Sequence, residues 1–84
     1  MSQRHITLQE ALDMMADAFS EPVAELQPER LRESIPGWDS MGALMLMAEL
    51  DERLGLVLEA EASREMRQVQ HVLDFLAAHG ALAA

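Results

Sequence analysis

Apolar residues recur at intervals of three and four positions in three segments of this sequence, at about residues 8–19, 40–54 and 66–78. That interval brings apolar side chains onto one face of an α-helix. Aromatic residues make up only 4% of the 84 residues, so the core has to be built from Leu, Ala, Met and Val, which favours helices over sheets. We therefore predict one all-α domain over residues 1–84, folded as a small bundle of three to four helices.

The ends of the predicted helices carry capping signals. Thr7, with Glu10 three positions later, forms a capping-box pattern at the start of the first helix. Gly55 is suited to end the second helix after residue 54, and His79-Gly80 to end the last helix after residue 78. A further short helical turn is expected at about residues 59–63. Residues 1–6 and 80–84 are expected to be flexible ends.

A long connection follows the first helix and contains all three prolines of the chain. A connection of this length is unusual in so small a domain and usually has a purpose. We expect Trp38, at its end, to be a packing anchor, and its closeness to Ser40 leaves open a second role in shielding or orienting a group on that serine. Four other apolar residues are expected to pin the connection across the bundle, namely Val23, Leu26, Leu31 and Ile35.

Ser40 stands at the predicted start of the second helix. Pro36-Gly37 predicts a tight turn, Asp39 and Ser40 are both residue types that cap helices, and the helical pattern begins directly afterwards. The Ser40 hydroxyl is therefore expected on the first turn, where free backbone N–H groups and the helix dipole favour a phosphate on the serine oxygen. This hydroxyl is typical of an attachment point, because the residues around it supply nothing to activate it as a nucleophile.

The run Trp38-Asp39-Ser40-Met41-Gly42 resembles the attachment site of the acyl carrier and peptidyl carrier protein family. In that family an Asp-Ser-Leu core opens the second helix, and the serine carries 4'-phosphopantetheine. The resemblance extends over about residues 6–76, and it implies a helical bundle of acyl-carrier type with a long loop between helices one and two. Other residues that match the family's pattern are Leu46, Met47, Leu50 and Leu54 in the second helix, Leu54-Gly55-Leu56 at its end, and Val69, Val72, Leu73, Asp74, Phe75 and Leu76 in the last helix.

The resemblance implies a carrier protein that catalyses nothing itself. Ser40 would hold 4'-phosphopantetheine, derived from coenzyme A, as a covalent cofactor that carries acyl or aminoacyl groups as thioesters. Asp39 would assist the Mg²⁺-dependent modification in addition to capping the helix. The implied partners are a phosphopantetheinyl transferase, an acyl- or aminoacyl-activating ligase or acyltransferase, and downstream condensing or transfer enzymes of a fatty acid, polyketide, nonribosomal peptide or related specialised pathway.

The sequence departs from the family's pattern at four positions. Gly42 and Met45 stand where carriers of bacterial fatty acid synthesis have acidic residues, and the chain is in this respect more similar to stand-alone carriers of specialised pathways or to carrier domains of polyketide and nonribosomal peptide systems. Gln68 and His71 stand where Thr and Asp are common in the last helix. Because Gly42 and Met45 stand in place of acidic residues, we expect the partner interface to depend less on charge than in the fatty acid carriers.

The second predicted helix is apolar around most of its circumference, because residues 41–50 contain a single charge. Such a helix is either buried or a binding site. If Ala43, Leu46, Met47, Leu50 and Leu54 face the core, four residues on the side of Ser40 face outward and are expected to form a partner surface with an acidic rim. These are Met41, Leu44, Met45 and Ala48, with Glu49, Asp51 and Glu52 as the rim. Two alternatives remain, a dimer seam and a helical interaction domain that is never modified.

The charge balance limits the kinds of partner. The chain has six Arg, no Lys and 15 acidic residues, which gives a net charge of −9. This charge would repel nucleic acid and anionic lipid and would complement cationic proteins. No Cys is present, so any sulfur for thioester chemistry has to be brought in on a prosthetic group. The start of the chain is unlike a signal peptide, and no segment reaches membrane-spanning length. We expect a monomeric, cytoplasmic protein without membrane insertion.

Other chemistry is weakly indicated. His5, His71 and His79 could serve a serine nucleophile as base, which would make the chain a small serine hydrolase, but none has a sequence relation to Ser40. The paired acids Asp51-Glu52 could act in acid–base catalysis, although a solvated charged helix end is the commoner case. Neither a phosphate-binding glycine loop nor metal-ligand spacing is present, so we expect no metal site and no catalytic residues.

Overall fold

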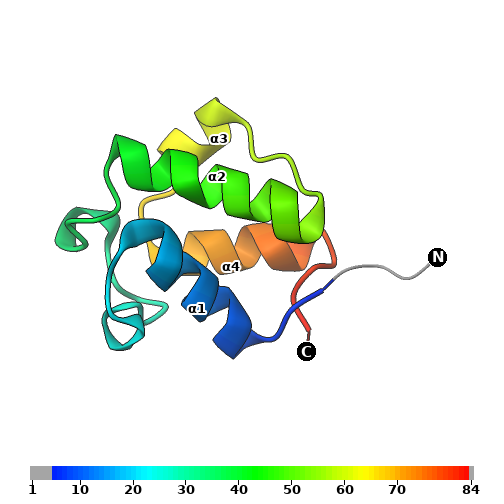
Figure 1. Ribbon diagram of the computed structural model, residues 1–84, viewed down its shortest axis with the longest axis horizontal. Coiled ribbons are helices and arrows are strands. Elements are labelled where there is room, and N and C mark those ends of the chain that lie inside the picture. The colour runs from blue at the N-terminus through cyan, green and yellow to red at the C-terminus, as the bar shows by residue number, and fades with distance from the viewer. Residues whose placement is uncertain (1–4, 84) are drawn as a thin grey trace.

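The second helix forms the middle of the fold, as a computed structural model that describes residues 5–83 shows (Figure 1). The fourth helix lies along it, the first crosses both, and the short third helix lies on its other side. Within residues 5–83 the structure has no strand, and the prediction of a small all-α bundle is confirmed. In chain order the elements are α1 (Leu8–Phe19), η1 (Val23–Glu25), η2 (Arg32–Ser34), α2 (Ser40–Leu54), α3 (Ala60–Glu65) and α4 (Val69–Ala78), where η marks a 3₁₀ turn.

The predicted ends of the first two helices are confirmed. At the start of α1 the backbone N–H of Glu10 donates to Thr7 Oγ1 at 3.1 Å, and the N–H of Thr7 donates to Glu10 Oε1 at 2.8 Å, which completes the capping box. Ser20 follows α1 in the left-handed conformation with φ 55°. Gly55 follows α2 with φ 65°, a conformation that glycine adopts at little cost.

The C-terminal half of the fold differs in detail from the prediction. The short turn expected at residues 59–63 is α3, which runs from Ala60 to Glu65. The last helix was expected from residue 66 and begins at Val69, because the residues before it are extended and pair with the long connection. The N–H of Arg32 donates to the carbonyl of Arg67 at 2.8 Å, and Leu31 and Gln68 form an antiparallel bridge. These tertiary hydrogen bonds replace the first turn of the expected helix.

The core lies between α1, α2 and α4. Its residues are apolar and mostly aliphatic, as the composition predicts, and burial of each large one contributes on the order of 1.5–3 kcal/mol. In the part of the chain that the structure describes, no helix is long and apolar enough to cross a membrane. The largest fully buried side chains are Met14, Met15, Leu26, Leu46, Leu50, Val69, Val72 and Leu76.

The long connection is anchored at fewer points than predicted. Leu26, Ile35 and Trp38 are buried, as expected. Val23 and Leu31 are exposed, so the prediction that they pin the connection is wrong. Leu31 is held through its backbone instead, by the bridge to Gln68. Its side chain stays exposed and does not enter the core.

The two ends of the described chain lie close together, at the side of the molecule opposite the long connection (Figure 1). Ile6 donates its N–H to the carbonyl of Ala81 at 2.8 Å, and Ala83 donates to the carbonyl of Ile6 at 2.7 Å. Ala81 is buried. These hydrogen bonds join the two ends, and the expectation of flexible ends stays a prediction, of which residues 1–4 and 84 lie outside the described residues.

Candidate functional site

Ser40 is the first residue of α2, and its side chain is exposed. Asp39 precedes it in an extended conformation and caps the helix, since its Oδ1 accepts the backbone N–H of Gly42 at 2.9 Å. The predicted cap is thereby confirmed. The Ser40 hydroxyl is thus held at the positive end of a 15-residue helix, where a negatively charged substituent is electrostatically favoured.

Two glycines allow the turn before Ser40 to approach α1 and α2 closely. A Cβ at Gly37 would lie 1.8 Å from the carbonyl oxygen of Phe19, and a Cβ at Gly42 would lie 2.0 Å from the carbonyl oxygen of Gly37. The N–H of Gly37 also donates to Glu21 Oε2 at 2.8 Å. The position of Ser40 therefore depends on three backbone segments that touch without intervening side chains.

Trp38 lies beneath the start of α2 and is buried, which confirms its predicted role as a packing anchor. Its ring stacks on Phe19 with centroids 4.8 Å apart and an interplanar angle of 16°. The guanidinium carbon of Arg32 lies 5.2 Å from the centroid of the same ring, within the range of a cation–π interaction. Shielding of a group on Ser40 by this ring stays a prediction.

Arg32 joins the long connection to the end of α3. Its Nε donates to the carbonyl oxygen of Trp38 at 3.2 Å, and its Nη1 donates to the carbonyl oxygens of Ser63 at 3.1 Å and Met66 at 3.3 Å. Burial lowers the pKa of Arg32 from its usual value, the nearby charge of Arg67 lowers it further, and Asp39 partly opposes both effects. Arg32 is therefore a positive charge held by neutral acceptors.

Replacement of this guanidinium should weaken the fold. We expect Arg32→Met to lower the free energy of unfolding by about 2–3 kcal/mol, because three partly buried carbonyl oxygens lose a charged donor. Urea denaturation followed by far-ultraviolet circular dichroism measures the effect. Arg64→Met is the matched control: within residues 5–83 the Arg64 side chain makes no hydrogen bond or ion pair, so this variant should stay within about 0.5 kcal/mol of wild type. If both variants lose the same free energy of unfolding, the hydrogen bonds of Arg32 to the three carbonyl oxygens do not stabilise the fold as predicted.

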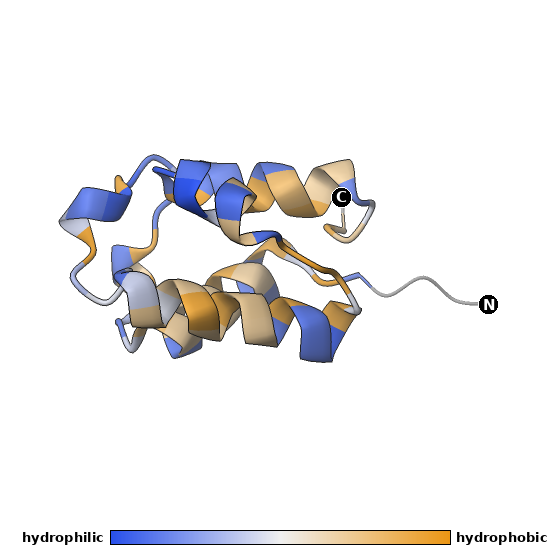
Figure 2. Ribbon diagram, turned by 90° about the horizontal axis from the view of Figure 1, so that it is seen from above, coloured by the Kyte–Doolittle hydropathy of each residue, from blue (hydrophilic) through white to orange (hydrophobic). Residues whose placement is uncertain are grey.

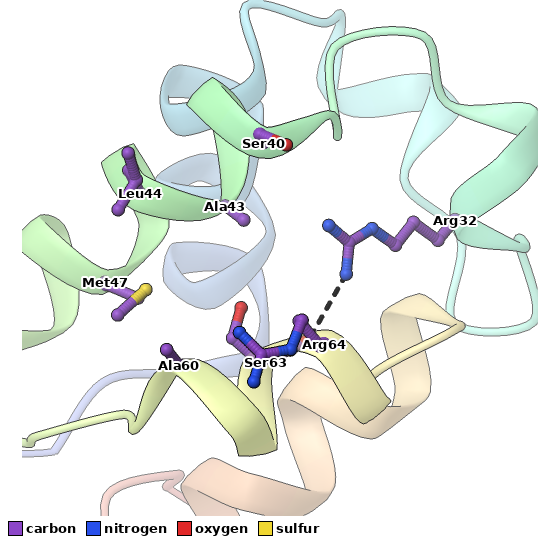
Figure 3. A pocket seen from close by; sticks show the side chains of 8 residues that line it. All are labelled: Arg32, Ser40, Ala43, Leu44, Met47, Ala60, Ser63 and Arg64. Carbon is purple, nitrogen blue, oxygen red and sulfur yellow. Dashed lines mark hydrogen bonds between the residues drawn. The ribbon is translucent and has the colours of Figure 1, made fainter.

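A cavity of ≈ 270 Å³ opens beside Ser40, between α2, α3 and η2 (Figure 3). Its polar lining consists of Ser40, Arg32, Ser63 and Arg64. Figure 3 shows the guanidinium of Arg32 at one end of the cavity and the Ser63 hydroxyl directed toward the space between α2 and α3. The apolar lining comes from Ala43, Leu44 and Met47 of α2 and Ala60 of α3.

A second hollow of ≈ 250 Å³ lies on the α1 side of the same helix start. Asp17 and Asp39 contribute carboxylates to it, and Met41 and Met45 contribute apolar surface. Ser40 lines the first cavity and not this one. The serine therefore faces the hollow that has arginines rather than the one that has carboxylates.

The outward side of α2 carries the apolar surface that the sequence predicts. Met41, Leu44 and Met45 are 66%, 59% and 45% exposed, and Ala48 is also exposed. The residues expected to face inward are buried, except that Met47 is half-buried and lines the cavity. In Figure 2 the ribbon of α2 is coloured as hydrophobic over most of its length and as hydrophilic near its end. We call Met41, Leu44, Met45 and Ala48 the apolar face.

The acidic rim of this face is less negative than its sequence suggests. Asp51 and Glu52 are exposed, as predicted. Glu49 is half-buried and pairs with Arg53 Nε at 2.7 Å, and Arg53 Nη2 also lies 3.6 Å from Asp17 Oδ2. Arg53 thus neutralises part of the charge on the side of the rim nearest α1.

The described residues show where the histidines and acidic residues considered for other chemistry lie. Between residues 5 and 83 no hydrogen bond joins the Ser40 hydroxyl to a histidine. Instead, His71 Nδ1 accepts the backbone N–H of Arg67 at 3.0 Å, just before α4. No group of three or more His, Cys, Asp or Glu residues among those described could hold a metal ion. The arrangement around Ser40 can hold and display a group on the hydroxyl.

Three polar residues of the cavity were not expected from the sequence. Arg32, Ser63 and Arg64 come from the long connection and from a helix of six residues, where no periodic pattern or motif marks them. The only signal available was that each of the few basic residues is an Arg, the residue best suited to bind carboxylates and phosphates.

In comparison with known proteins, no family model matches this chain.

Proposed function

We propose that this protein is an acyl carrier that holds 4'-phosphopantetheine on Ser40 and presents acyl or aminoacyl groups to the enzymes of a biosynthetic pathway. The observation that carries the proposal is the placement of an exposed serine as the first residue of a capped helix, beside an apolar face and, among residues 5–83, without a hydrogen bond from its hydroxyl to a histidine. A carrier needs these features, whereas a hydrolase needs a base. Cytoplasmic location and a monomeric state belong to this proposal.

The residues around Ser40 fit the attached group. A phosphate ester on the Ser40 oxygen would lie at the N-terminal end of α2, where the helix dipole favours negative charge. When bound, the group would supply a thiol on a mobile arm, which the chain itself lacks. Asp39 keeps the first turn of the helix in place and stays exposed, so a transferase could reach it together with the serine.

The test is modification of the purified chain. Incubation with coenzyme A, Mg²⁺ and a broad-specificity phosphopantetheinyl transferase should add the mass of one phosphopantetheine, with 3',5'-ADP as the leaving group. Trypsin cleaves after Arg32 and Arg53, so the added mass should be found on the peptide that contains residues 33–53. Folded protein that stays unmodified with several such transferases would overturn the proposal.

The apolar face should be where the transferase binds. We expect the double variant Met41→Ser and Met45→Ser to lower the kcat/KM of modification by about tenfold or more, which corresponds to a loss of about 1.4 kcal/mol of interface energy. Both side chains are exposed, so the free energy of unfolding should change by less than about 1 kcal/mol. The assay measures initial rates of modification at several concentrations of the carrier.

Val57→Ser is the matched control, since Val57 is 69% exposed and lies outside the apolar face. It should be modified at the wild-type rate. If the Met variants bind other protein partners less well but no variant is ever modified, the second candidate gains support, namely an unmodified interaction domain. The exposure of three large apolar side chains on one helix favours that candidate over other non-carrier functions.

A further inference from the structure

The cavity beside Ser40 concentrates positive charge in a chain whose net charge is −9. Arg32 and Arg64 both line it, and Arg67 is close enough to Arg32 to lower its pKa. Among the described residues the ion pairs that form involve Arg30 and Arg53, and neither Arg32 nor Arg64 contacts a carboxylate. Such a pair of arginines is complementary to an anion that the chain does not itself provide.

The donors of this cavity are available to a ligand. Arg32 uses Nε and Nη1 for backbone carbonyls, and its Nη2 makes no hydrogen bond within residues 5–83. These bonds fix the guanidinium plane in advance, so little conformational entropy is lost when a ligand binds. Arg64, on α3, keeps all of its donors available because it has no partner among the described residues.

Ser63 adds a hydroxyl group to the two arginines of the cavity. The residue is 4% exposed and lines the cavity. In the described part of the chain its hydroxyl makes no hydrogen bond, although its backbone carbonyl accepts from Arg32. Among the described residues the buried polar atom that lacks a partner is Trp38 Nε1 and not the Ser63 hydroxyl, so the hydroxyl is reachable from the cavity and can donate to a ligand there.

We propose that Arg32, Arg64 and the Ser63 hydroxyl form a subsite for an anionic oxygen group that belongs to what Ser40 carries. This inference rests on the proposed function. Two groups have the required chemistry: the phosphodiester that would link the arm to Ser40, and a carboxylate at the far end of a dicarboxylic cargo. The apolar lining from Leu44 and Met47 suits the methylene chain that leads to such a carboxylate. The hollow on the other side of α2 is unsuitable, because Asp17 and Asp39 line it.

The experiment compares three proteins that carry defined groups: wild type, Arg64→Gln, and Arg53→Gln as a control with the same change in charge. Each is modified with coenzyme A, or with adipoyl-coenzyme A whose terminal carboxyl carbon is ¹³C. Arg64 is exposed and makes no internal bond, so its variant should fold normally. The ³¹P resonance of the arm reports on the phosphodiester, and the pH titration of the ¹³C carboxyl resonance reports on the cargo.

The two measurements distinguish the sources of the anion. If the phosphodiester occupies the subsite, the ³¹P shift of wild type differs from that of Arg64→Gln and equals that of Arg53→Gln. If the cargo occupies it, the titration midpoint of the carboxyl group is lower in wild type than in Arg64→Gln, because the guanidinium favours the charged form. Resonances that are alike in all three proteins would overturn the subsite but leave the carrier function intact. A chain that no transferase modifies would overturn the proposed function, and this inference with it.

Discussion

Ser40→Ala is expected to abolish modification completely while the protein stays folded. The Ser40 hydroxyl would supply the only oxygen through which the arm is attached, so no mass should be added at any transferase concentration. The side chain is exposed and the helix is capped by Asp39 rather than by Ser40, so the free energy of unfolding should change by less than about 0.5 kcal/mol. Intact-protein mass spectrometry and urea denaturation measure the two effects.

Ser34 provides the matched control for this variant. It is exposed, it precedes α2 by a few residues, and it lies on the same tryptic peptide, 33–53, so peptide mass alone would not separate the two serines. Ser34→Ala should be modified to the same extent as wild type. If Ser40→Ala is still modified and Ser34→Ala is not, Ser34 is the modified residue, and the proposal that the helix start at Ser40 is the attachment site is wrong.

Gly42→Ala is expected to destabilise the protein by about 3 kcal/mol, opposite in sign to the usual effect of this change. Inside a helix, Ala is normally more stable than Gly by roughly 1 kcal/mol. Here the new Cβ would lie 2.0 Å from the carbonyl oxygen of Gly37 and 3.2 Å from Phe19 Cδ1, and the first of these is backbone that has to move. Overpacking of this kind commonly costs 1–3 kcal/mol. Urea denaturation followed by circular dichroism gives the sign directly.

Two further glycine variants separate close contact from backbone conformation. Gly37→Ala should be as damaging as Gly42→Ala, since its Cβ would meet the carbonyl of Phe19 at 1.8 Å. Gly55→Ala should cost only about 1 kcal/mol, because its φ of 65° is unfavourable for Ala but no atom lies within 4 Å of the new Cβ. A stabilising effect at Gly42 would show that the turn before Ser40 can retreat from α2.

The exposed apolar residues of α2 border both hollows beside Ser40. Met41 and Met45 border the hollow on the α1 side, whereas Leu44 and Met47 border the cavity that has the arginines. A partner that binds Met41 and Met45 would therefore approach Ser40 from the α1 side, away from the cavity that Arg64 lines. In the proposed carrier, docking and cargo binding could then occur at the same time.

The sequence by itself determined the features that depend on residues within about four positions of one another. The capping box of Thr7 and Glu10, the Asp39 cap, the Gly55 end of α2 and the outward turn of Met41 are local in this sense, and all were predicted. Capping bonds and helical periodicity are set by neighbours along the chain, so they can be inferred without knowledge of the fold.

Only the tertiary structure decided what surrounds Ser40. Arg32 and Ser63 are 31 positions apart, and they meet because η2 and the end of α3 pack beside the start of α2. Other long-range backbone hydrogen bonds shorten α4 and hold Ile6 against Ala81, and Leu31 stays at the surface despite its apolar side chain. Such contacts form because buried backbone N–H and C=O groups of several segments have to find hydrogen-bond partners in one another. No pattern of neighbouring residues shows which segments will meet. Hence the sequence could place Ser40 at the start of a helix, while the cavity beside it arose only from the packing of segments far apart in the chain.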